Sequence, residues 1–376
     1  MPMHKVIHSD AAKAALQERG WTQKALAAQL GVTGQAVTNW LNGSNFPAPS
    51  MLLKLAVALR LPFDQLVKKE VSGNEPIIAF RTKANVKTTD VHVFKAKAMG
   101  VILGPLLEFL EPMPGLPRTM ADKSLTYTNL QALASEVRKT LAVGVTAVLR
   151  YEDLIDEFAA NRAVLVPVLW GHQQSHRNAL HILLPQTRTT FIFLNLDTHL
   201  EDFKFWMAHE LAHVYTPDLA GKLEGEDFAD AFAGALLFPQ ALAEQAYSQG
   251  LRAGRRSVLA VLQHFAQEHN ISLNTVFSQT CRYAQDARLP PLPCDAKEIH
   301  AARMMSRGAM VSETLFNPMP PLPELYMAAT KRVFRSQFFE ALRRMVKSKN
   351  TGAGYIQQVM DIPMQDALAL HEQVSR

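Results

Sequence analysis

The segment His209-Glu210-Leu211-Ala212-His213 places two histidines four residues apart, with a glutamate directly after the first. On an α-helix, residues i and i+4 lie on the same face, so both imidazoles would point towards one centre. Glu210 would lie beside them, within reach of a water molecule held at that centre. The segment alone is moderate evidence for a metal site, and such a site would need a further ligand from elsewhere in the fold.

The flanking residues predict the helix and a partner for it. Thr198 and Glu201 have the spacing of a capping box, Pro217 would end the helix, and an apolar stripe runs along it through Leu200, Phe203, Met207, Leu211 and Val214. A second apolar helix then begins with Glu226 and Asp230, again four residues apart and on one face. Two histidines and one glutamate would leave zinc one open position, as in a catalytic site. Asp230 could accept a hydrogen bond from the second ring nitrogen of a histidine ligand.

The first seventy residues predict a helix-turn-helix. Thr22 and Thr33 can each cap the helix that follows. Between them, Gly31 can adopt the left-handed conformation that ends the first helix. A small residue, Ala27, stands where the helices approach, and apolar residues recur where two steeply crossing helices would bury them: Leu26, Leu30, Val32, Val37 and Trp40. Further helices are expected at residues 10–19, 50–59 and 62–67.

Composition excludes several classes of protein. The chain has 376 residues, of which 48% are hydrophobic and 19% charged, so it is too apolar for disorder and long enough for two or three globular units. Cys281 and Cys294 form no CxxC pair, which excludes a disulfide scaffold or a zinc ribbon. No apolar stretch reaches transmembrane length, and the first residues do not resemble a signal peptide. We therefore expect a cytoplasmic protein.

The net charge of +5 is distributed unevenly. It is +4 over residues 1–70, +2 over 71–121, −7 over 122–250 and +6 over 251–376. A basic N-terminal part and an acidic middle suggest domains with separate partners. We expect a helix-turn-helix domain at 1–70, a helical linker at 71–121, the domain with the histidine pair at 122–289, and a helical C-terminal region at 290–376.

The pattern beyond the first domain is mostly helical with a few strands. Residues 164–170, 181–184 and 190–194 are short, apolar and partly β-branched, which predicts strands. Helices are expected around residues 122–140, 151–161, 199–215 and 225–238, and in part of 77–110. The predicted fold is therefore multidomain and mainly α: a five-helix N-terminal domain, an α+β domain with a small sheet, and a helical C-terminal extension.

The C-terminal helices carry a cluster of basic residues: Arg332, Arg335, Arg343, Arg344, Lys347 and Lys349. A solvated helical face is favoured over a second nucleic-acid surface.

The N-terminal segment resembles the lambda-repressor-like (XRE, Cro/cI) family of DNA-binding domains over roughly residues 5–69. The resemblance implies that residues 34–41 form the helix that lies in the major groove. The side chains implied to face DNA are, for base contacts, Gln35, Thr38 and Asn39 and, for phosphate contacts, Gln23, Lys24 and Asn42. The sequence departs from the family pattern at position 34, where it has glycine and the family often has a larger polar residue. Since the local charge is small, we expect a homodimer on a two-fold, double-stranded DNA operator.

The pattern AHELAH, followed by an ExxADxFA helix, resembles the ImmA/IrrE family of metallopeptidases from about residue 125 to 245. The resemblance implies a zincin-like fold in which His209, His213 and Glu226 bind Zn²⁺, or alternatively Mn²⁺. It makes Glu210 the general base and Asp230 the partner that orients a ligand histidine. The sequence departs from the family at Ala212, where glycine is usual, and at Asp230, where asparagine is frequent.

Together the resemblances imply a transcriptional regulator with a zinc-dependent endopeptidase domain that cleaves a repressor or antitoxin protein in a prophage, stress or toxin–antitoxin circuit. The alternative is a non-hydrolytic transcription factor whose peptidase-like domain senses a ligand or partner. The sequence does not assign the residue that would stabilise the oxyanion. Tyr215 should face away from the histidine pair. His172, His176 and His181 are candidates, although each is more often an ordinary histidine.

Overall fold

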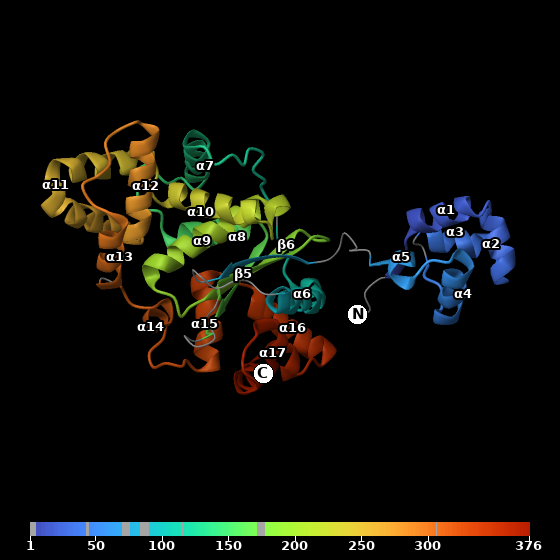
Figure 1. The fold of residues 1–376 in the computed structure, drawn as a ribbon. Coiled ribbons are helices and arrows are strands. Elements are labelled where there is room, and N and C mark those ends of the chain that lie inside the picture. Colours follow the sequence, from blue (N-terminus) through green and yellow to red (C-terminus); the bar gives the residue numbers. More distant parts are fainter. Residues whose placement is uncertain are drawn as a thin grey trace. The chain divides into compact units, whose positions relative to one another are not determined.

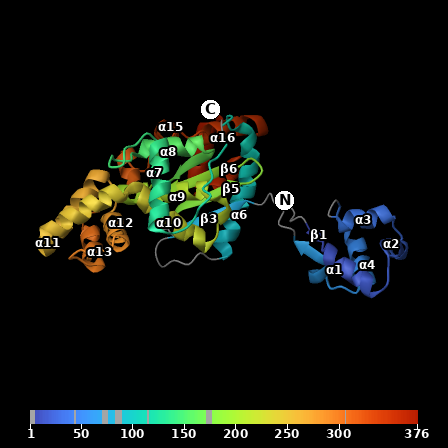
Figure 2. The ribbon, with the colours of Figure 1, turned by 90° about the horizontal axis from the view of Figure 1, so that it is seen from above.

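The computed structural model describes residues 5–42, 45–69, 76–82, 90–113, 116–170, 177–305 and 307–376. The chain divides into two compact units, Met1–Glu75 and Pro76–Arg376. Figures 1 and 2 draw the two units as ribbons. Each unit has its own hydrophobic core. The fold is mainly helical with a small sheet, as the sequence predicts. Within the described residues, no helix combines the length and hydropathy needed to cross a bilayer.

The described part of the N-terminal unit has the predicted helices. They are α1 (Ser9–Glu18), α2 (Gln23–Leu30), α3 (Gly34–Leu41), α4 (Pro49–Leu59) and α5 (Phe63–Leu66). The unit also contains two strands that the sequence did not predict, β1 (Lys5–Ile7) and β2 (Val67–Lys69), which pair antiparallel. This pairing joins the start of the unit to its end.

Local signals set the geometry of α2 and α3. The hydroxyls of Thr22 and Thr33 accept hydrogen bonds from the third residue of each helix, at 3.2 and 3.1 Å. Gly31 ends α2 with a φ of 68°, a conformation that disfavours residues with a Cβ. The predicted core side chains are buried in one cluster, except that Val32 is half-buried. The two helices therefore form the predicted helix-turn-helix.

The larger unit is built on a four-stranded sheet. Its strands are β3 (Ile77–Thr82), β4 (Ala163–Val168), β5 (Arg177–Leu184) and β6 (Thr189–Asn195), in the order β3-β5-β6-β4. β5 pairs antiparallel with both β3 and β6, and β4 pairs parallel with β6. The three strands predicted from the sequence correspond to β4, β5 and β6.

Different helices cover the two faces of the sheet (Figure 1). Successive residues of a strand point to opposite faces. On β5, His181 points towards Glu210 of α9 (Leu200–Tyr215), whereas Ile182 packs towards Gly100 of α6 (Asp90–Leu103). A Cβ at Gly100 would collide with Pro76 and crowd Ile182, so glycine allows this close approach.

The remaining helices surround this sheet. On the side of α9 lie α8 (Tyr151–Ala160) and α10 (Leu223–Leu237), with α7 (Tyr127–Thr140) against α10. α11 (Gln240–His269), α12 (Leu273–Asp286) and α13 (Ala296–Met305) lie side by side at one end (Figures 1 and 2). The other short elements are η1 (Gly104–Phe109), η2 (Pro217–Leu219), α14 (Val311–Leu315), α15 (Pro323–Phe334), α16 (Phe338–Lys349), α17 (Ala353–Met360) and α18 (Met364–Ser375).

The predicted helical linker at residues 71–121 is wrong in one respect, because residues 77–82 form the strand β3. A six-residue strand gains its stability from a partner, and the partner of β3 lies about a hundred residues later in β5. The predicted boundaries at 121 and 289 also fall inside one compact unit, which begins at Pro76.

The predicted capping box at the start of α9 is also wrong. The cap position is His199, and its side chain accepts no capping hydrogen bond. A segment far along the chain supplies the hydrogen-bond partners at this helix end. Leu200 N donates to Ala309 O at 3.1 Å, and the Glu201 side chain accepts from Gly308 N at 3.3 Å. Tertiary contacts thus replace a local cap.

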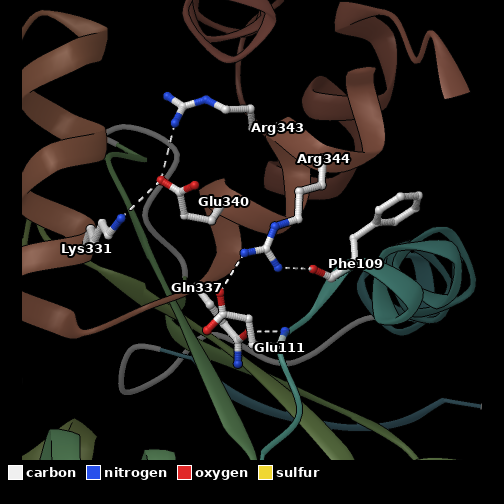
Figure 3. A network of polar contacts seen from close by, with 7 residues as sticks. All are labelled: Phe109, Glu111, Lys331, Gln337, Glu340, Arg343 and Arg344. Carbon is white, nitrogen blue, oxygen red and sulfur yellow. Dashed lines mark hydrogen bonds and ion pairs between the residues drawn. The ribbon is translucent and has the colours of Figure 1, made fainter. Parts of the chain in front are cut away.

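Ion pairs neutralise much of the positive charge on the C-terminal helices, and Figure 3 shows several of them. Arg344 pairs with Glu111 at 2.6 Å and Lys349 with Glu108 at 2.8 Å, which ties α16 to the segment around η1. Three further pairs involve these helices: Arg335 with Asp156, Arg343 with Glu340, and Lys331 with Glu340. Internal pairing favours the interpretation as a structural helical face over a nucleic-acid surface.

One buried cation links α7 to α10. The guanidinium of Arg138 donates to Leu236 O at 2.9 Å and to Gly144 O at 2.7 Å, and also to Ala147 O. Burial lowers its pKa to about 10, so it stays charged at neutral pH. We expect Arg138→Met to leave buried carbonyls without donors and to lower the free energy of unfolding of the larger unit by about 2–4 kcal/mol. Calorimetry against Lys139→Met, an exposed neighbour on the same helix, measures this. Equal effects of both substitutions would contradict it.

Candidate functional site

The candidate metal centre lies between α9 and α10, which pack against each other. Every residue of α9 from Met207 to Tyr215 is buried, because this helix lies between α10 and the sheet. Polar side chains on such a helix need partners, since burying an uncompensated polar group is costly. Those partners come from α10 and from β5.

Three potential ligand residues converge there, and both carboxylate oxygens of Glu226 take part. His209 Nε2 lies 3.1 Å from His213 Nε2 and 3.4 Å from Glu226 Oε2, and His213 Nε2 lies 3.2 Å from Glu226 Oε1. The structure thus brings together the three residues that the sequence suggested as ligands. Among the described residues, these three are the group of histidine, cysteine or acidic side chains compact enough to hold a metal ion.

The spacing of these atoms fits zinc. Zinc–nitrogen bonds of ~2.0–2.1 Å at tetrahedral angles place neighbouring ligand atoms about 3.3–3.4 Å apart. The three measured separations, 3.1 to 3.4 Å, are close to this value. Two imidazole nitrogens and a carboxylate oxygen are also a donor set that zinc prefers.

Asp230 lies behind the first histidine. Its Oδ1 is 2.9 Å from His209 Nδ1, which directs the other nitrogen, Nε2, towards the centre. Burial alone would lower the pKa of His209, but the hydrogen bonds with Asp230 and Glu226 outweigh it and raise this pKa to about 9. Burial alone would raise the pKa of Glu226, but the two imidazoles outweigh it and lower this pKa to about 2. The carboxylate of Glu226 is therefore ionised near neutral pH, and its negative charge would attract a cation.

Glu210 and His181 lie next to the ligands. Both are buried, and Glu210 Oε2 is 3.5 Å from His181 Nδ1. The ring of His181 also meets the ring of His213 edge to face, with centroids 5.7 Å apart. Burial lowers the pKa of His181, outweighing the attraction of Glu210.

Tyr215 points away from the centre, as the sequence predicts. Its hydroxyl donates to Glu157 Oε1 at 2.8 Å, and Arg118 and Asn161 donate to the same oxygen at 3.0 and 2.8 Å. This buried network anchors the end of α9 to α8. Tyr215 therefore has a structural role.

The candidate DNA-contacting residues lie together on α2 and α3. Gln35 is exposed and donates to Asn39 Oδ1 at 2.9 Å. The Thr38 hydroxyl lies within hydrogen-bonding distance of Gln23 Oε1, 3.2 Å, and of Gly34 O, 3.0 Å, so it links the two helices. The two other candidates, Lys24 and Asn42, are exposed.

The histidine candidates for an oxyanion-stabilising role have different outcomes. His172 and His176 lie outside the described residues. His181 lies next to the metal centre, although an ordinary role was the favoured interpretation of its sequence context. The available signal was a single histidine in the apolar stretch from Ala179 to Leu184, but only the strand register shows which side chain it faces.

Comparison with protein families finds two matching domains. A family model described as a helix-turn-helix matches residues 13–66. A peptidase-family model described as an IrrE N-terminal-like domain matches residues 170–277, which include β5, α9 and α10. No curated protein matches the chain. The chain therefore joins an XRE-type helix-turn-helix domain to an IrrE N-terminal-like domain of the M78 peptidase family.

Proposed function

We propose that the chain is a cytoplasmic, homodimeric transcriptional regulator whose larger unit is a zinc-dependent endopeptidase. Its substrate would be a repressor or antitoxin protein in a prophage, stress or toxin–antitoxin circuit. The observation that carries the proposal is the convergence of His209, His213 and Glu226 within 3.4 Å, with Glu210 beside them. Mn²⁺ could replace Zn²⁺ in this site.

The residues suit peptide hydrolysis. When bound, zinc supplies a Lewis acid that makes water nucleophilic near neutral pH and polarises the peptide carbonyl. Glu210 accepts the proton of the attacking water and delivers it to the leaving amine. Burial of Glu210 keeps other water away from this carboxylate. Once His209 has lost its second proton on metal binding, Asp230 would hold the ring in the tautomer that has hydrogen on Nδ1 and leaves Nε2 free.

Glu210→Gln should lower turnover by at least ~100-fold, because the amide cannot accept the proton. Cleavage of a proteome-derived peptide library by the zinc-loaded protein, read by mass spectrometry, supplies a substrate for this measurement. Glu224→Gln, at an exposed position of α10, is the matched control. Zinc content should be unchanged in both variants, and equal cleavage by both would contradict the role of Glu210.

A second candidate is a non-hydrolytic regulator. The complete and capped helix-turn-helix favours it, because DNA binding needs no turnover. The same Glu210→Gln variant separates the two functions in cells. If it regulates its promoter as the wild type does, the peptidase is not the regulatory output.

Asp230→Ala should weaken zinc binding by ~10–100-fold, because His209 loses the partner that fixes its tautomer. Competition with a chromophoric chelator measures the affinity. Asp227→Ala, which removes an exposed carboxylate from the same helix, controls for the loss of negative charge. Similar affinities for both variants would show that Asp230 does not orient the ligand.

Gln35→Ala should relax sequence preference at one base position by about 1–3 kcal/mol, because an exposed side chain of α3 then loses its base contact. Lys24→Ala should instead weaken binding to all duplexes alike and reduce the salt slope by about 1. Duplexes selected from a random pool provide the probe. Gln17→Ala, on the exposed face of α1, is the control and should change neither quantity. If Gln35→Ala binds with unchanged sequence preference, side chains other than Gln35 contact the bases.

A further inference from the structure

Several buried polar atoms around the metal centre lack hydrogen bonds within the described part of the chain. They include both ring nitrogens of His181 and Glu210 Oε2. A buried polar atom without a partner lowers stability, so native structures rarely retain such atoms without a function. Here the two residues face each other, with His181 Nδ1 3.5 Å from Glu210 Oε2.

We infer that His181 is a positioning residue: its Nδ1–H donates to Glu210 Oε2 and holds the carboxylate of the general base towards the metal centre. The catalytic consequence rests on the proposed peptidase function, but the contact itself does not. Hydrogen bonds in catalytic sites are often long before substrate binds and tighten in the loaded site. A separation of 3.5 Å is consistent with such a contact.

The sheet holds His181 in this position. Its neighbours across the sheet are Ala79 on β3 and Ile192 on β6, and neither side chain can accept a hydrogen bond. β5 lies between these two strands, so the backbone of His181 is fixed on both sides. A rigid support of this kind is what a positioning contact requires.

Two other roles fit less well. As a metal ligand, His181 would belong to the compact ligand group, but that group contains only His209, His213 and Glu226 among the described residues. As a core filler, it would be a poor choice, because a buried imidazole with two unpartnered nitrogens is less favourable than an apolar side chain.

The tautomer of His181 tests the contact without any catalysis. Nitrogen NMR of the metal-free, histidine-labelled protein, assigned with a His181→Phe sample, should show hydrogen on Nδ1. In Glu210→Ala, which removes the acceptor, the population should move towards the Nε2–H form. Hydrogen on Nε2 in the wild-type protein would overturn the inference, whether or not the protein is a peptidase.

Three substitutions test the consequence for turnover, with the peptide selected in the cleavage assay as substrate. An asparagine amide nitrogen lies near the position of Nδ1, whereas that of glutamine lies near Nε2. His181→Phe should lower kcat by ~10–100-fold with little change in KM, His181→Asn should recover most of the loss, and His181→Gln should not. Zinc content should remain that of the wild type in all three.

The outcomes distinguish the claims. Recovery by glutamine instead of asparagine would overturn the role of Nδ1, and loss of zinc in His181→Phe would make His181 part of metal binding. If the wild type cleaves no peptide while its NMR spectrum shows Nδ1–H, the proposed function fails and the contact stands.

Discussion

The larger unit depends on one constraint: α9 buries two imidazoles and the carboxylate of Glu210 in what is otherwise an apolar core. Such groups are tolerated in a core only when their polar atoms meet one another or a cation. A hydrogen bond between the Nε2 atoms of His209 and His213, 3.1 Å apart, still leaves the other ring nitrogen of each histidine without a partner on α9. α10 is therefore needed to bring Glu226 to both of them, and Asp230 to the far side of His209. Neighbouring elements hold the two helices of this polar centre in place. Strand β5 packs against α9, and Arg138 of α7 donates a hydrogen bond to the end of α10.

The charge distribution has a structural basis as well. The acidic excess of residues 122–250 includes the carboxylates of the metal centre, whose charge a divalent cation would offset. The basic excess of the C-terminal residues is met in part by acids from elements that come earlier in the chain, such as Glu108 and Glu111. Each exposed pair contributes little energy. As a set, however, these pairs hold α16 against the segment around η1, on the side of the sheet opposite the metal centre (Figures 1 and 3).

Sequence analysis predicted the features that have local causes. The bounds of α3, the caps at Thr22 and Thr33, and the helix with the histidine pair depend on residues within a few positions of each other. It missed β1, β2 and β3, because short strands depend on partners distant in sequence. The start of α9 was predicted to within one residue, but its capping box was wrong for the same reason, since Leu200 N donates to the distant Ala309 O. The convergence of His209, His213 and Glu226 could be predicted from spacing, whereas the position of His181 beside Glu210 requires the strand register.

The edge strand β3 also determines where the larger unit can be separated from the rest of the chain. A fragment that begins at residue 122, where the charge changes sign, would lack β3 and α6. β5 would then be an edge strand with unpaired backbone groups, which is a template for aggregation. The packing of Pro76 and Ile182 around Gly100 would be lost with it. Exchange of the N-terminal unit for a different domain, by recombination or by engineering, must therefore join the chain before Pro76.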